Sequence, residues 1–213
     1  MLRRVLIVSL LVLAVSACAQ LAALHPVHDT PYTRAIDTLA TNSGDSTFLF
    51  VESQRRVHVA LGNLEKAIAI VALKEAAFIE ERNGIRYYRM DGMQKVNEYI
   101  NANPADYDTF LAKGSVDQIL DVTLGMSLAL YCTKVAIGDM QALSSMTPEG
   151  PDAVHADEAS DTMSFATSSQ QAQLTALSTL VPRLTDFLSS KGVDVSNLVN
   201  NANAASQVAD FLK

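Results

Sequence analysis

The sequence has no tryptophan, only two cysteines and few charged side chains, and these shortages exclude several classes of protein. Two cysteines cannot supply the several disulfides that hold a small secreted domain together. The net charge is −7 at pH 7, so the chain lacks the basic surface that nucleic-acid-binding proteins present to phosphates. Apolar residues make up 49% of the chain, which predicts a folded protein rather than a disordered one.

The sequence also lacks the short motifs that indicate catalysis most directly. It contains no G-x-S-x-G nucleophile elbow, no G-x-x-x-x-G-K phosphate loop, no H-E-x-x-H zinc motif and no C-x-x-C pair. The Glu-x-x-His pairs of di-iron helical bundles and the C-x-x-C-H site for covalent haem are missing too. We therefore expect a protein that is not an enzyme and that needs no metal or cofactor.

The first 17 residues have the composition of a bacterial secretory signal. Arg3 and Arg4 precede an apolar run over residues 5–15, which is shorter than the ~20 residues that a membrane-spanning helix needs. Val15-Ser16-Ala17 then stands directly before Cys18. An aliphatic residue and two small residues before a cysteine resemble the lipobox of bacterial lipoproteins.

The lipobox resemblance implies both a modification and a location. In that class the cysteine thiol, here of Cys18, receives a diacylglycerol, the signal is cut before it, and the new amine is acylated. Several acyl chains hold a protein firmly to a membrane, because each buried methylene contributes ~0.8 kcal/mol. Ala19 and Gln20 follow instead of an Asp, which in a Gram-negative cell implies the periplasmic face of the outer membrane. Residues 18–29 are then a lipidated tether, and residues 30–213 form a single helical domain.

The spacing of apolar residues predicts an all-α fold, an irregular bundle of about six or seven helices. No segment shows a clear strand alternation, and residues 85–90 are ambiguous between strand and helix. The long second helix carries Glu52 and Arg56 at the favourable i, i+4 spacing. The predicted helices cover residues 31–40, 45–83, 93–102, 104–113, 115–145, 162–191 and 196–212.

Local residues set the predicted helix boundaries. Residues 41–44 are expected to end the first helix, and Asn83-Gly84 the second, with Gly62 as a weak point inside it. Residues 147–161 are rich in Pro, Gly and acids without Lys or Arg, which predicts an acidic linker. Pro182 is expected to bend or restart the helix after it, and Ser196 to cap the last helix.

The helix over residues 115–145 is predicted to be the buried centre of the bundle. Ser115 and Gln118 match a capping box, and residues 122–133 carry no charge. Gly125 and Ala129 lie on one face and would let a partner helix approach closely. A membrane span is the competing interpretation, but the uncharged run is short.

A group of arginines and tyrosines is the most distinctive surface signal. Rigid aromatic rings beside planar guanidinium donors suit recognition of peptides, glycans and acidic groups. The alternative is that these tyrosines cap the edge of the bundle and the arginines pair with nearby acids. We expect a bend that presents Tyr87 or Tyr88 beside the arginines, so that charge reversal at Arg86 and Arg89 leaves folding unchanged. The candidate binding patch is Arg82, Arg86, Tyr87, Tyr88 and Arg89.

The histidines and the second cysteine are weaker candidates. His25 and His28 lie beside Asp29 on the tether, where two or three ligands would make a poor metal site. His58 lies inside the long second helix near Arg55 and Arg56 and is expected to be a structural or surface residue. Cys132 lies in the apolar helix, where burial disfavours a reactive thiolate. Asp152 and His155 lack the spacing of a calcium loop, so a mobile acidic loop is the simpler interpretation.

These observations predict a lipid-anchored envelope protein that acts by binding, as an accessory or scaffold to other envelope components. Two other functions remain open. A periplasmic carrier of a small apolar ligand would show an empty cavity with apolar walls. An enzyme would show oriented polar residues clustered in a cleft.

Overall fold

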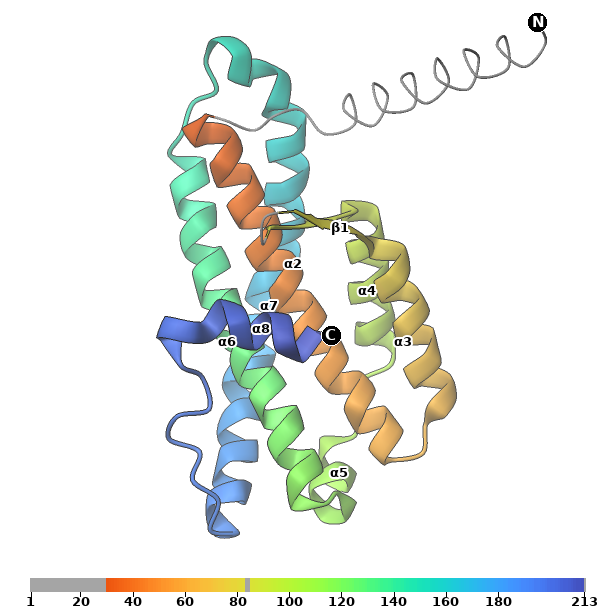
Figure 1. Ribbon diagram of the computed structural model, residues 1–213. Helices are drawn as coiled ribbons and strands as arrows, with labels where there is room; N and C mark the ends of the chain where they lie inside the picture. Colours follow the sequence, from red (N-terminus) through yellow and green to blue (C-terminus); the bar gives the residue numbers. More distant parts are fainter. Residues whose placement is uncertain (1–29, 83–84, 213) are drawn as a thin grey trace, which may run out of the picture. The chain divides into compact units, whose positions relative to one another are not determined.

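The computed structural model of the protein describes residues 30–82 and 85–212. This part of the chain contains seven α-helices and one small antiparallel sheet (Figure 1), so the predicted all-α irregular bundle is confirmed. In chain order the elements are α2 (Pro31–Ala60), α3 (Leu64–Ala77), β1 (Phe78–Arg82), β2 (Ile85–Tyr88), α4 (Met90–Ala102), α5 (Tyr107–Lys113), α6 (Val116–Ser144), the 3₁₀ turn η1 (Gly150–His155), α7 (Ala156–Ser190), the 3₁₀ turn η2 (Asn201–Asn203) and α8 (Ala204–Leu212).

Helix α2 runs without a break through residues 41–44, where the sequence predicted an end. The hydroxyl of Ser43 donates to the carbonyl of Leu39 at 2.6 Å, and the hydroxyl of Thr47 donates to the carbonyl of Ser43 at 2.9 Å. Both side chains therefore find their hydrogen-bond partners within the helix itself. Gly44 allows the ring of Tyr88 to pack on the backbone, since an added Cβ would lie 2.3 Å from that ring. Packing therefore overrides the turn preference of these residues.

The predicted weak point at Gly62 is confirmed as the end of α2. Gly62 has a φ of 77°, a left-handed conformation that glycine adopts without steric cost. The N–H of Asn63 donates back to the carbonyl of His58 at 2.8 Å and closes the helix. The chain then reverses, and α3 runs back beside α2 (Figure 1).

The predicted end of the second helix at Asn83-Gly84 is wrong, because α3 already ends at Ala77 and a β-hairpin follows. β1 and β2 pair antiparallel, with Glu81 opposite Arg86. Asn83-Gly84 joins the two strands in the sequence and lies outside the described residues. Asn-Gly is typical of hairpin turns as well as of helix ends, and the strands described on either side of it show that the second helix does not extend to this dipeptide.

The predicted start of α6 is confirmed in detail. The N–H of Gln118 donates to the Ser115 hydroxyl at 3.2 Å, and the N–H of Ser115 donates to the Gln118 side chain at 2.9 Å. This reciprocal capping box satisfies two N–H groups that the first turn would otherwise leave unpaired. The helix ends at Ser144, close to the expected residue.

The C-terminal third departs from the predicted boundaries. The acidic linker is shorter than expected, because η1 occupies residues 150–155 and α7 begins at Ala156. α7 then continues past Pro182 as one helix. Ser196 does not cap the last helix, since both its N–H and its hydroxyl bind Asp194. That helix, α8, begins at Ala204 instead.

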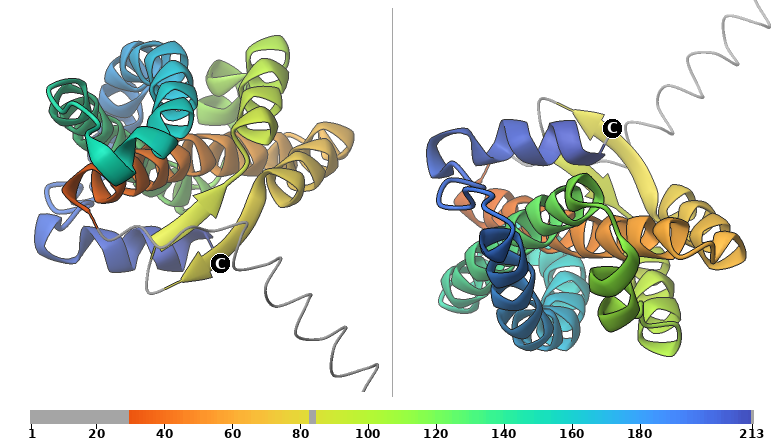
Figure 2. Two further views of the ribbon diagram at one scale, coloured as in Figure 1. Left: turned by 90° about the horizontal axis from the view of Figure 1, so that it is seen from above. Right: turned by 90° about the horizontal axis from the view of Figure 1, so that it is seen from below.

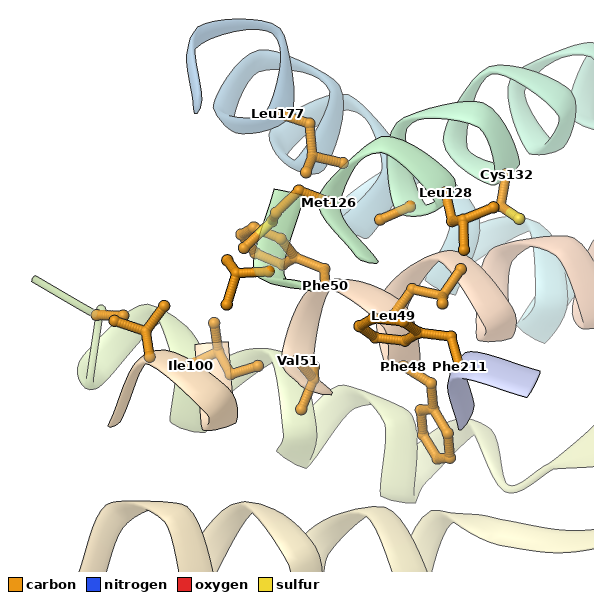
Figure 3. Packing of buried hydrophobic residues seen from close by; sticks show 14 of the residues in the cluster. Phe48, Leu49, Phe50, Val51, Ile100, Met126, Leu128, Cys132, Leu177 and Phe211 are labelled. Carbon is orange, nitrogen blue, oxygen red and sulfur yellow. The ribbon is translucent and has the colours of Figure 1, made fainter. Parts of the chain in front are cut away.

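The hydrophobic core lies where α6 and α7 pack against α2 (Figure 3). As predicted, the uncharged part of α6 is buried, with Met126, Leu128 and Ala129 inaccessible to solvent. At Gly125 an added Cβ would lie 2.3 Å from the Ser53 hydroxyl of α2 and 2.2 Å from the ring of Phe211. The expected close approach of a partner helix is therefore confirmed.

Among the described helices, α6 is the one that is long and apolar enough to cross a membrane. More than half of its most apolar window, 56%, is buried by the rest of the protein. Apolar side chains all round a helix are equally expected at the centre of a bundle. The packing of α6 on both α2 and α7 supports that second interpretation.

Polar side chains also run through the core, between α2 and the helices that cover it. Ser46 of α2 donates to the side-chain oxygen of Gln173 of α7 at 2.8 Å, and Gln173 donates to Thr47 at 2.8 Å. Leaving either buried partner unsatisfied would cost about 1–3 kcal/mol, so these bonds favour one register of α2 against α7.

Candidate functional site

A pocket of about 510 Å³ lies between α3, the β1–β2 hairpin and α8. Figure 2 shows the hairpin and α8 together on one side of α2. Four charged side chains line the pocket: Lys74, Glu75, Glu81 and Arg86. The remaining lining is apolar or aromatic and consists of Phe48, Val71, Phe78, Tyr88, Ala209 and Leu212. We call this the hairpin pocket.

The wall formed by β2 is fixed to α2 through the buried Asp45. Arg86 Nη1 lies 2.6 Å from Asp45 Oδ2, and the Tyr88 hydroxyl donates to Asp45 Oδ1. Because side chains alternate along a strand, Arg86 and Tyr88 share the face that points to α2. The Tyr88 ring packs edge-on against Phe48, with 4.8 Å between ring centres. Tyr88 therefore joins the polar contacts of Asp45 and Arg86 to the aromatic wall of the pocket.

Burial sets the ionisation of Asp45 and Tyr88. Burial raises the pKa of the Asp45 carboxyl above its ordinary value, and the Arg86 guanidinium and Tyr88 hydroxyl offset part of that rise. Burial, together with the nearby Asp45, also raises the pKa of Tyr88 well above its ordinary value. Tyr88 thus remains a neutral hydrogen-bond donor at physiological pH, which suits a structural role.

The structure divides the arginines and tyrosines that the sequence grouped together. Arg86 and Tyr88 turn inward onto Asp45, so Tyr88 is not presented to solvent, and of the two tyrosines that the sequence offered only Tyr87 is partly accessible. Arg89 is exposed and Tyr87 is half-buried, whereas the side chain of Arg82 lies outside the described part. The predicted patch is therefore not one surface. Arg86 and Tyr88 contribute to binding only as walls of the hairpin pocket.

A cluster of charges beneath the pocket holds four elements together. Glu52 of α2 accepts hydrogen bonds from Arg55 at 2.9 Å, from Lys74 of α3 at 2.8 Å and from Arg56 at 3.2 Å. Arg56 continues to Asp121 of α6 and lies 3.9 Å from the ring centre of Phe211 in α8. Burial opposes ionisation of Glu52, but Arg55 and Lys74 hold its pKa at about 2. The sequence indicated only the pair of Glu52 and Arg56.

The exposed side of α3 carries a row of apolar residues. Leu64, Ile68 and Val71 are spaced by four and three positions, so they lie on one helical face. Their exposed fractions are 58%, 69% and 39%. Val71 and the neighbouring Phe78 also line the hairpin pocket, so the row leads directly into it. We call these four residues the α3 strip; contiguous exposed apolar rows of this kind are typical of interaction sites.

The remaining candidate residues in the described part, two histidines and one cysteine, have contacts that suit a structural role. His58 is 1% exposed, and its Nε2 lies 3.3 Å from the carbonyl oxygen of Asn103. Burial lowers the pKa of His58, so its neutral form is favoured. Cys132 is buried as expected, and burial raises its pKa to about 12, which makes it a poor nucleophile. His155 Nδ1 lies 3.1 Å from a carboxylate oxygen of Glu158.

Several sequence predictions lie outside the described residues. These include the lipobox with Cys18 and the histidines at positions 25 and 28. Within residues 30–82 and 85–212, no group of three His, Cys, Asp or Glu side chains is arranged to hold a metal ion.

Comparison with protein-family models, with curated proteins and with solved structures gave no match to this chain.

Proposed function

We propose that this protein is a lipid-anchored component of the bacterial envelope that binds another envelope protein through the α3 strip and the hairpin pocket. Cys18 carries the lipid, and the helical domain acts as an accessory or scaffold without catalysing a reaction. The observation that carries the binding surface is the exposed row Leu64, Ile68 and Val71, which runs into a pocket with aromatic walls.

The strip and the pocket have the composition of a protein-binding surface. Burying an exposed Leu, Ile or Val contributes about 1.5–3 kcal/mol, so burial of the α3 strip would offset part of the entropic cost of association. Glu75 and Glu81 lie around the pocket and supply the polar rim that such interfaces usually have. An apolar side chain of the partner would fill the pocket between Phe48 and Phe78.

The α3 strip can be tested with a matched pair of substitutions. Ile68→Glu places a charge in the middle of the strip, and Val154→Glu places one at an equally exposed apolar residue on η1. We expect Ile68→Glu to abolish capture of the envelope partner by the anchored protein and Val154→Glu to retain it. Both substitutions should change the free energy of unfolding by no more than ~0.5 kcal/mol.

The same experiment can identify the contact directly. A photo-crosslinking residue at position 68 is expected to join one recurring envelope protein in intact cells, whereas the same residue at position 154 joins none. Equal cross-linking from both positions, or undiminished capture by Ile68→Glu, would mean that the α3 strip is not the binding surface.

The anchor is tested separately at Cys18. We expect Cys18→Ser to leave an unlipidated, uncleaved precursor, because the lipobox class requires the thiol for acyl transfer. Metabolic labelling with a fatty acid and mass spectrometry of the mature N-terminus measure both outcomes. An unmodified Cys18 in the mature wild-type protein would contradict the anchor while leaving the α3 strip as it stands.

The hairpin pocket also favours a second function, that of a periplasmic carrier. Six of its lining residues offer apolar or aromatic surface: Phe48, Val71, Phe78, Tyr88, Ala209 and Leu212. Such walls suit a small apolar ligand. Native mass spectrometry of protein purified from its own envelope separates the two functions. A carrier retains a small apolar molecule that Phe78→Glu releases, whereas a scaffold is recovered with a protein.

A further inference from the structure

A second cleft, of about 770 Å³, lies between α4 and α7 and has no part in the function proposed above. Both views in Figure 2 place α4 and α7 across α2 from the hairpin. From α7 the cleft is lined by a row of small residues, Ser164, Ser168, Ala172 and Ala176, at intervals of four. These small residues leave a shallow channel along the helix. The hollow is therefore distinct from the hairpin pocket and could hold a second ligand.

The two helices that form the cleft run in the same direction. Asn97 of α4 lies 3.5 Å from Gln173 of α7 near the middle. Farther along both segments, Arg183 of α7 is paired with Asp108 at the start of α5. The first turns of α4 therefore lie beside the first turns of α7. The cleft has one end at the start of both helices and the other end near α5.

One end of the cleft is acidic. Asp91 and Asp161 line this end, and Glu98 lies farther along α4. Asp91 is paired with Lys95 of its own helix at 3.8 Å, whereas Asp161 is exposed and its carboxylate makes no ion pair or side-chain hydrogen bond within the described residues. No Lys, Arg or His is among the residues that line the cleft. This end therefore disfavours an anionic ligand and favours a cation.

The middle of the cleft is lined by amides. Asn97 and Gln173 lie at its floor, and Gln54 of α2 accepts a hydrogen bond from the N–H of Ala105 at 3.2 Å. Gln94 and Asn101 continue the amide row along α4. The side chains of Gln173 and Gln54 are hydrogen-bonded within the protein, whereas the exposed amides of Gln94 and Asn101 can donate to and accept from the N–H and C=O groups of a peptide backbone.

The other end of the cleft is apolar. Ile100, Pro104, Ala176 and Leu180 line it together with Tyr107. The hydroxyl of Tyr107 is buried and has no hydrogen-bond partner among the described residues. Buried polar groups normally have a hydrogen-bond partner. A donor or acceptor from a ligand could therefore bond to this hydroxyl.

We propose that the cleft between α4 and α7 binds an extended peptide segment with Lys or Arg at one end and an apolar residue about seven positions away. Asp161 and Ala176 are 15 residues apart on α7, or about 22 Å at 1.5 Å per residue. An extended chain covers that distance in about seven residues at ~3.3 Å each. The carboxylates bind the cationic end, and the exposed amides and the Tyr107 hydroxyl bind the backbone. The apolar side chain packs against Ile100, Pro104 and Leu180.

The proposal is tested by fluorescence anisotropy with the full-length lipidated protein in detergent micelles. The probe is a labelled octapeptide, Lys-Lys-Ser-Ala-Ser-Ala-Leu-Leu. A version with Glu in place of both Lys and a version with Glu in place of both Leu serve as comparison peptides. We expect the first peptide to bind at least tenfold more tightly than either comparison, and its affinity to fall as salt is raised. Equal binding of all three peptides would overturn the proposal.

Substitutions show whether binding occurs in this cleft. Asp161→Lys and Ala172→Trp should each weaken binding of the octapeptide at least tenfold, by reversing charge at one end and by filling the channel. Asp186→Lys and Gln171→Trp are the matched controls, since both residues are exposed on α7 and neither lines the cleft. Circular dichroism confirms that each variant folds. Unchanged affinity of Asp161→Lys and Ala172→Trp would place the peptide elsewhere and overturn the assignment.

A neutral oligosaccharide is the competing ligand, because amides and aromatic rings also suit sugars. Chitotetraose is the probe for it. Binding of chitotetraose that Ala172→Trp abolishes, together with no binding of the octapeptide, would make the cleft a saccharide site and overturn the peptide proposal. The Ile68→Glu variant should bind the octapeptide normally, so failure of the α3 strip and failure of this cleft are distinguishable.

Discussion

Glu52→Gln is expected to lower the free energy of unfolding by about 3–5 kcal/mol at pH 7. Glu52 is buried and accepts hydrogen bonds from Arg55, Arg56 and Lys74. A neutral amide cannot balance these cations, and removing one partner of a buried ionic cluster usually costs this much. Urea denaturation followed by circular dichroism measures the loss. Glu149→Gln, in an exposed loop, is the control and should change stability by no more than ~0.5 kcal/mol.

The same residue gives the protein a defined sensitivity to acid. The pKa of Glu52 falls from an ordinary 4.5 to about 2 in the folded protein. The folded state therefore binds this proton less readily than the unfolded chain. The stabilisation is complete above pH ~4.5 and is lost as the pH falls towards ~2, by about 3 kcal/mol in total. In Glu52→Gln this part of the acid dependence should disappear. An acid limb identical to that of the wild type would show that Glu52 is not the titrating group.

Arg86→Glu is expected to unfold or strongly destabilise the protein, by about 3–5 kcal/mol. The substitution removes the cation that pairs with the buried Asp45 and puts a second carboxylate beside it and beside Glu81. The hairpin then loses its ion pair to α2 and keeps the contacts of Tyr88 with Asp45, Phe48 and Gly44. The melting temperature and the urea midpoint measure the effect.

Arg89→Glu is the matched control, because it is exposed at the start of α4 and should melt within a degree or two of the wild type. This contrast replaces the expectation from the sequence that charge reversal at both arginines leaves folding unchanged. Normal stability of Arg86→Glu would mean that the bond to Asp45 contributes little, and the outward-facing patch would again be a candidate.

The hairpin explains why the candidate site could be only partly anticipated. Two residues of the predicted patch, Arg86 and Tyr88, line the hairpin pocket. The sequence could not show that both turn inward, because Asp45 lies 41 residues away from Arg86 along the chain. The α3 strip was not recognised either. Ile68 has the spacing of a core residue, but in the folded protein no other described element covers it, so its side chain is exposed.

Local sequence by itself determined the helical class and those boundaries that short-range bonds create. The capping box of Ser115 and Gln118 and the left-handed Gly62 need no distant partner, and both were predictable. Packing decided the rest. Residues 41–44 are helical because Tyr88 covers Gly44 and the hydroxyl of Ser43 bonds within the helix, although their local preference is to turn. The inward direction of Arg86, the cluster around Glu52 and both clefts depend on residues far apart in the chain, which only the tertiary structure brings together.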